Sequence, residues 1–225
     1  MKHRYLIFPL LLSLIFYSSC YKCHDEQLST MVFSQADLAI NPYVNGNQVT
    51  FISSTEDTLN YKIFRRMDRD AFFENQGTDY FALHGCKGRW YFSDYNKTDL
   101  SAHDNSWIGI NLSFVDSYSR PGTKLIQFFL SFSDTAIAEL NVPLKFDSGV
   151  LMNSEDYSYF NSHLEGLFDT IRLGPNVYHN VYKITNEPQF RGRYKNNWVE
   201  NFYYSTSEGV VGFTLKNSKY YYLSK

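Results

Sequence analysis

The sequence predicts a mainly β protein, either an antiparallel sandwich or a partly open barrel, with an N-terminal signal helix and few short helices. The 225 residues include 19 Tyr, 19 Phe and 3 Trp, and aromatic and β-branched side chains favour strands. Short runs of alternating apolar and polar residues are separated by turn residues at regular spacing, a pattern typical of sandwiches and barrels. Long windows with a helical period are missing.

The first twenty residues have the layout of a secretory signal. Lys2 and Arg4 give a basic start, residues 5–17 are apolar, and two small residues, Ser18 and Ser19, follow. A helix over residues 5–17 would be about 20 Å long, shorter than the roughly 30 Å hydrocarbon core of a bilayer. We therefore expect a signal peptide over residues 1–19.

Ser18-Ser19-Cys20 resembles the lipobox of bacterial lipoproteins, although Tyr17 stands where that motif usually has an aliphatic residue. The resemblance implies that Cys20 carries acyl chains such as palmitate, which attach the protein to a membrane of the cell envelope. Tyr21 follows in place of the aspartate of inner-membrane lipoproteins, which implies the outer membrane. An ordinary cleaved signal with Cys20 in a disulfide, and an uncleaved helical anchor, remain open.

Beyond the signal, we expect a tether over residues 20–42, with a short helical turn within 31–39. A single β-rich domain is expected over residues 43–225. If Cys20 is acylated, Cys23 and Cys86 can form a disulfide in an oxidising compartment. Two free thiols are the alternative.

The strands of this domain are expected between clusters of turn residues. They are 49–53, 59–63, 89–95, 107–115, 125–133, 142–146, 177–184, 198–205, 210–215 and 219–223. We expect 107–115 and 125–133 to form an antiparallel pair, because Pro121-Gly122 marks a turn between them. Residues 65–80 fit a short helix or a surface loop, and 157–168 fit a strand or a helical turn.

The C-terminal third also carries a resemblance. Residues 180–184, 202–205 and 208–213 are similar to the closing strands of Bacteroidota outer-membrane lipoproteins, and residues 47–63 are similar to their first strands. The resemblance implies a lipoprotein β-domain and supplies no active site.

Charge and motifs exclude several classes of function. The chain has 21 basic and 23 acidic residues, which is not the balance of a nucleic-acid-binding protein. Motifs of hydrolases, metalloproteases and phosphate-binding loops are absent. Asp68, Asp70 and the pair Glu155-Asp156 are the densest carboxylates outside the tether, but a glycosidase needs two that meet across a cleft. We expect no enzyme.

No cofactor is expected either. His84 and Cys86 lie two residues apart, and His103 is nearby, but a zinc site needs three or four ligands and no second cluster is present. We expect no metal site.

Four aromatic residues are candidates for a binding surface, because sugars and proteins dock on exposed rings. They are Trp90, Tyr91, Trp107 and Trp198. The leading hypothesis is a non-enzymatic envelope lipoprotein with a structural or interaction role, whose partner is an envelope protein or a glycan. The alternative is a lectin-like module that binds glycans through these aromatic residues, and the third reading is an envelope hydrolase.

Three segments match the Asp-Ser/Thr-apolar pattern of Bacteroidota O-glycosylation. Their acceptor residues are Thr58, Thr135 and Thr170. Modification requires exposure, and we expect Thr58 to be the best placed.

Overall fold

The computed structural model describes residues 26–74, 89–103, 106–117, 120–132, 137–147, 149–153, 162–186 and 198–225. The chain divides into two compact units. One comprises residues 1–30 and 71–92, of which the structure describes short strand segments. The other comprises residues 31–70 and 93–225, and it contains most of the described strand residues, the core and the surfaces discussed below.

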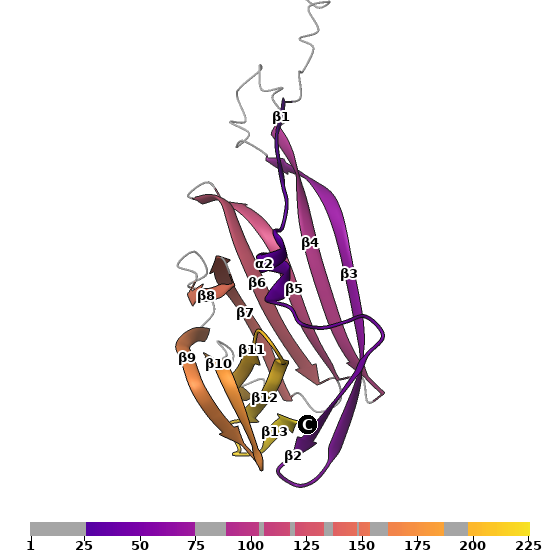
Figure 1. The fold of residues 1–225 in the computed structure, drawn as a ribbon, viewed down its shortest axis with the longest axis vertical. Helices are drawn as coiled ribbons and strands as arrows, with labels where there is room; N and C mark the ends of the chain where they lie inside the picture. Colours follow the sequence, from indigo (N-terminus) through magenta and orange to yellow (C-terminus); the bar gives the residue numbers. More distant parts are fainter. Residues whose placement is uncertain are drawn as a thin grey trace, which may run out of the picture. The chain divides into compact units, whose positions relative to one another are not determined.

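The described residues form thirteen strands and one short helix (Figure 1). The elements are β1 (Glu26–Met31), α2 (Gln35–Ala39), β2 (Gln48–Ser53), β3 (Thr58–Glu74), β4 (Arg89–Ala102), β5 (Trp107–Ser117), β6 (Arg120–Phe132), β7 (Ile137–Asp147), β8 (Val150–Asn153), β9 (Ser162–Leu173), β10 (Asn176–Asn186), β11 (Val199–Ser205), β12 (Gly209–Leu215) and β13 (Tyr220–Leu223).

The prediction of a mainly β fold with few helices is confirmed, and of the two predicted architectures the structure is the barrel. Hydrogen-bonded neighbours follow the order β8-β7-β6-β5-β4-β3-β2-β13-β12-β11-β10-β9. Neighbouring strands whose register is described run antiparallel, and the sheet curls until it is nearly closed. Pairing of β13 with β2 joins the last described strand of the chain to an early one, and Tyr222 lies opposite Ile52.

The two ends of the sheet, β8 and β9, meet at a seam where the Asn153 side chain bonds the backbone of β9. The amide of Asn153 donates through Nδ2 to the carbonyl oxygen of Leu164 at 3.1 Å. Its Oδ1 accepts from the Leu164 backbone N–H at 2.7 Å. Asn153 therefore takes the place of a peptide group, and satisfies backbone groups that an open sheet edge would leave unpaired.

The predicted strands are present. Two segments for which the sequence left alternative structures open also contain strands. Residues 107–115 and the described residues 125–132 form the predicted pair, with Ile110 opposite Phe128. Residues 65–74 continue β3 instead of forming a helix or a loop. Residues 162–168 begin β9.

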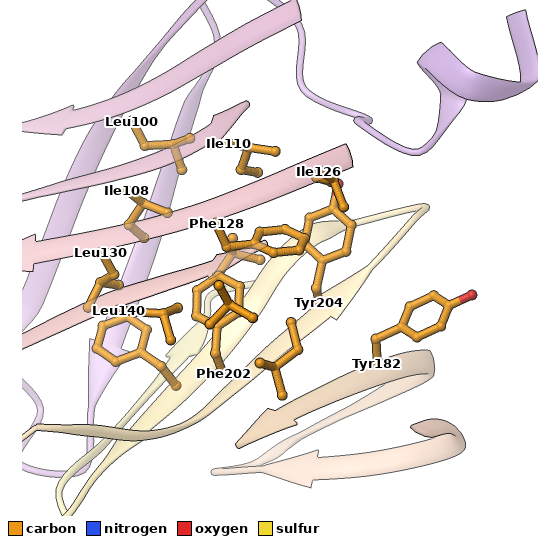
Figure 2. Packing of buried hydrophobic residues seen from close by; sticks show 14 of the residues in the cluster. Leu100, Ile108, Ile110, Ile126, Phe128, Leu130, Leu140, Tyr182, Phe202 and Tyr204 are labelled. Carbon is orange, nitrogen blue, oxygen red and sulfur yellow. The ribbon is translucent and has the colours of Figure 1, made fainter. Parts of the chain in front are cut away.

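Inward-facing aromatic and aliphatic side chains fill the space enclosed by the sheet (Figure 2). Phe128 of β6 lies with its ring centroid 4.8 Å from that of Tyr204 and 5.4 Å from that of Phe202, both on β11. In the sheet order β6 and β11 are widely separated, so these rings join opposite walls. The interior is consequently a packed core.

Residues 33–43, which we call the plug, depart from the predicted tether. Phe33, Ile40 and Tyr43 are buried in the same core as the inward-facing strand residues, and the Phe33 ring stacks on Phe146 of β7 at 6.1 Å. The expectation of a tether over residues 20–42 is therefore wrong for residues 33–42. The predicted helical turn is present as α2, with Ser34 and Asp37 forming a capping box at its start.

Polar contacts fix the plug against the inner face of the sheet. Lys124 of β6 donates to both carboxylate oxygens of Asp37, at 2.9 and 2.8 Å. Burial opposes ionisation of Asp37, but these bonds and those from Ser34 outweigh it and hold the pKa of the carboxyl below its usual value. On the other side, Arg65 of β3 donates to the carbonyl oxygens of Asn41 and Tyr43 at 3.0 and 2.6 Å.

The β9–β10 hairpin bends so that its tip contacts the end of β13. Asn180 has a φ of 51°, a conformation that asparagine tolerates better than most residues, and the pairing skips this residue. Beyond the bend, Asn176 Nδ2 and the Tyr178 hydroxyl both donate to the carbonyl oxygen of Leu223. A second, smaller core forms there around Tyr178, Val181 and Tyr203.

Candidate functional site

The outer face of the sheet carries a hollow of about 310 Å³ where β2, β3 and the end of β4 come together. Six of its lining residues carry the argument below: Gln48, Asn60, Lys62, Phe64, Ser101 and His103. We call it the Phe64 hollow. It lies within the larger of the two units.

The alternation of β3 explains why these side chains reach the surface. Tyr61 and Ile63 point inward and are buried, whereas Asn60, Lys62 and Phe64 are exposed, as period-two geometry requires. Phe64 leaves 49% of its surface exposed. Lys62 places its ammonium nitrogen 5.4 Å from the centre of the Phe64 ring, a cation–π distance.

Pairing between β2 and β3 places amide groups beside the ring. Gln48 lies opposite Lys62, and Thr50 lies opposite Asn60. The Thr50 hydroxyl donates to Asn60 Oδ1 at 2.7 Å, which fixes the orientation of that amide. Amide side chains therefore line the same hollow as an exposed aromatic ring.

A second exposed ring lies two strands away on the same face. Trp107 opens β5 and stands opposite Ser101, which lines the hollow. Its ring stacks on Phe129 of β6 at 5.9 Å and 29°, and it lies over Gly109, where a Cβ would come within 3.2 Å of Trp107 Cε3. Trp107 is 36% exposed. One strand, β4, separates β3 from β5. Neighbouring strands are about 4.8 Å apart, so β3 and β5, which carry Phe64 and Trp107, are about 10 Å apart across the sheet.

The four predicted aromatic residues differ in exposure and in whether their side chains are described. Trp107 is exposed, as a binding aromatic requires. Trp198 is 6% exposed and belongs to the core, with Lys216 over its ring at 5.8 Å, so the expected exposed ring is not present there. Trp90 and Tyr91 lie on β4, but their side chains are outside the described residues.

Sequence reasoning missed Phe64. The strand expected over residues 59–63 already placed residues 60 and 62 opposite to the core face, and one more step along the strand would have placed Phe64 with them. The expected end at residue 63 hid this signal.

The remaining predicted sites lie partly outside the described residues. Cys20, Cys23, Cys86 and Thr135 belong to undescribed segments, as do Glu155, Asp156 and His84. Thr58 and Thr170 are exposed on β3 and β9. Asp68 is exposed, accepts from the Tyr95 hydroxyl at 3.0 Å and lies 3.6 Å from Arg66 Nε.

Within the described ranges, no group of three or more His, Cys, Asp or Glu side chains is placed to hold a metal ion. No helix among the same residues has the length and apolar character that a membrane crossing requires.

Comparison with known proteins adds no relative: no family model matches the chain, and neither a curated sequence nor a solved structure matches it.

Proposed function

We propose that this chain is a lipid-anchored protein of the cell envelope with a non-enzymatic interaction role, and that its ligand is a glycan. The observation that carries the proposal is the pair of exposed rings, Phe64 and Trp107, on one face of the sheet beside a polar hollow.

Sugar rings suit such a surface for two physical reasons. Their C–H faces pack on aromatic rings, which carry large apolar area together with a specific geometry. Their hydroxyl groups exchange hydrogen bonds with amides and hydroxyls, which the hollow offers through Gln48, Asn60 and Ser101. Binding sites commonly combine apolar walls with a few placed polar groups.

The envelope location rests on the N-terminal sequence. The basic start, the short apolar run and the Ser18-Ser19-Cys20 step favour export and acylation of Cys20. Acyl chains stabilise membrane attachment by about 0.8 kcal/mol per buried methylene, and they would hold the domain at a membrane surface, with the outer membrane favoured by Tyr21.

Glycan binding is tested with the purified full-length protein in detergent on a glycan array, followed by calorimetry on the hits. We expect Phe64→Ala and Trp107→Ala to weaken binding about tenfold or more, since stacking on a ring contributes about 1–3 kcal/mol. Phe168→Ala is the matched control, because Phe168 is also an exposed phenylalanine, 39% accessible, but lies on β9.

The array result has two decisive outcomes. Binding that survives both substitutions, or that falls equally in the Phe168 control, would contradict a site at these rings. Absence of any hit with protein that retains its β-rich circular dichroism would contradict glycan binding itself.

The anchor is tested by labelling with a clickable palmitate analogue in the native host. Label on the wild type and none on Cys20→Ala is the expected result. Unlabelled wild type would show that Cys20 is not acylated, and Cys20 would then be available for a disulfide.

A further inference from the structure

We propose that the Phe64 hollow selects acidic sugars, with the carboxylate of a uronic acid seated beside Lys62 and His103. The inference rests on the proposed glycan-binding function and specifies its class of ligand.

The charge of the lining is the first argument. Its eight residues include one lysine and one histidine, and no aspartate or glutamate. Lys62 and His103 therefore line the hollow, and its lining has no carboxylate that could pair with them.

Lys62 differs from most of the lysines that the structure describes in having no carboxylate partner. Ion pairs hold Lys97, Lys124, Lys183, Lys216, Lys219 and Lys225. Across the described part of the chain, Lys62 makes no such pair, and its ammonium lies against the Phe64 ring instead. A ring offers an exposed cation about 0.5–1 kcal/mol and leaves its N–H donors free for an anion.

The amides beside Lys62 add donors. Gln48 stands directly opposite Lys62. Asn60 has its Oδ1 occupied by the Thr50 hydroxyl, so its NH₂ group is the part left to meet a ligand. A carboxylate only accepts hydrogen bonds, and bonds from a charged donor are stronger than neutral ones. A carboxylate thus matches this cluster of donors better than a neutral hydroxymethyl group does.

Phe64 distinguishes an acidic sugar from a simple anion. Half of its surface is exposed, and a phosphate or carboxylate alone would leave that apolar surface in water. A uronic acid presents an apolar ring face to the phenyl group and a carboxylate to the ammonium at the same time, so it uses both features.

The test compares each of two acids, trigalacturonic acid and triglucuronic acid, with its own uncharged methyl ester. Binding to the full-length protein in detergent is measured by calorimetry at low and high salt. We expect the acids to bind about fivefold more tightly than their esters, the size of an exposed ion pair. The difference should shrink at 1 M salt, where screening is nearly complete.

Variants assign the preference to the hollow. Lys62→Gln should bring acid and ester to equal affinity while ester binding is retained. Lys97→Gln is the matched control, because Lys97 is a half-exposed lysine of β4 held by Asp99, and it should leave the preference unchanged.

Other outcomes would contradict either the acidic preference alone or glycan binding as well. Equal binding of acids and esters to the wild type, or array hits that are all neutral, would overturn the acidic preference and leave glycan binding standing. Displacement of the acid by inorganic phosphate at the same concentration would show an anion site that ignores the sugar, and would also overturn it. Failure of folded protein to bind any glycan would overturn the proposed function and this inference together.

Discussion

The backbone N–H of Val210, at the start of β12, donates a hydrogen bond of 2.7 Å to the hydroxyl oxygen of Tyr43, 167 positions earlier in the chain. The neighbouring strand makes a similar contact, because the Tyr204 hydroxyl donates to the carbonyl oxygen of Ile40. Both tyrosines are buried, and burial raises the pKa of each phenol. The plug is therefore joined to the C-terminal hairpin by neutral hydroxyl groups.

Replacing Tyr43 by phenylalanine should cost about 1–3 kcal/mol in the free energy of unfolding. The ring still fills its place, but the buried N–H of Val210 loses its acceptor. Urea denaturation measures the loss. Tyr220→Phe, at a half-buried tyrosine of β13, is the control, and an equal loss in both variants would argue against a specific role for the Tyr43 hydroxyl.

Gly209→Ala should destabilise the protein by about 3 kcal/mol or more. Gly209 has a φ of +82°, and a Cβ there would come within 2.6 Å of the Tyr43 hydroxyl oxygen. Gly46 has a similar φ of +86° with nothing within 4 Å, so Gly46→Ala should cost only the backbone strain, about 1 kcal/mol. Similar thermal and urea transitions for the two variants would contradict the contact between Gly209 and the plug.

Asp37→Asn should lower the free energy of unfolding by about 2 kcal/mol at pH 7, because it leaves the Lys124 ammonium without its counter-charge. The pKa of Asp37 is depressed in the folded state. Its ionic contribution is therefore complete above the unfolded pKa of 3.8 and is lost as the pH falls through the lower folded value. The gap between wild type and variant should close over that acidic range.

Urea titrations at a series of pH values between 2 and 7 measure this gap. Asp57→Asn is the control, since Asp57 also binds a lysine, Lys219, but its side chain is 64% exposed. It should give a smaller change. A gap for Asp37→Asn that stays constant down to the lowest pH would show that the carboxylate charge contributes nothing.

Asn153→Ala should loosen the seam without unfolding the barrel. The substitution removes both hydrogen bonds to the Leu164 peptide, each worth about 1 kcal/mol. Hydrogen exchange should show faster exchange of the Leu164 amide, by about fivefold or more. The amide of Val181, which lies on β10 away from the edge, should keep its rate, and unchanged exchange at Leu164 would mean that the seam does not depend on Asn153.

Strands were predictable where one face is core and the other is solvent. Ile108, Ile110 and Leu112 alternate with smaller or polar residues and are fully buried, so the pattern and the outcome agree. Beyond Ile63 the β3 sequence is rich in charged residues and has no clear apolar alternation, yet the strand continues to Glu74. Pairing with the neighbouring strands of the sheet stabilises this part, and local sequence does not reveal it.

The plug could not be inferred as core, because its burial depends on partners distant in sequence. Ser34 and Asp37 gave a local signature of a helix start, and this part was predictable. The burial of Ile40 and Tyr43 follows from contacts with Tyr204 and Val210, which no local pattern encodes. The same holds for the site: Trp107 was a predicted binding aromatic, but its position two strands from Phe64 on the same face arises from the strand order.

The position of the plug also dictates an order of folding. Tyr204 and Val210 lie 164 and 167 positions after their plug partners Ile40 and Tyr43. The plug cannot be enclosed until β11 and β12 are present, and contacts of such long sequence separation form slowly. Until then Phe33, Ile40 and Tyr43 lack their final partners, and transiently exposed apolar side chains of this kind favour aggregation.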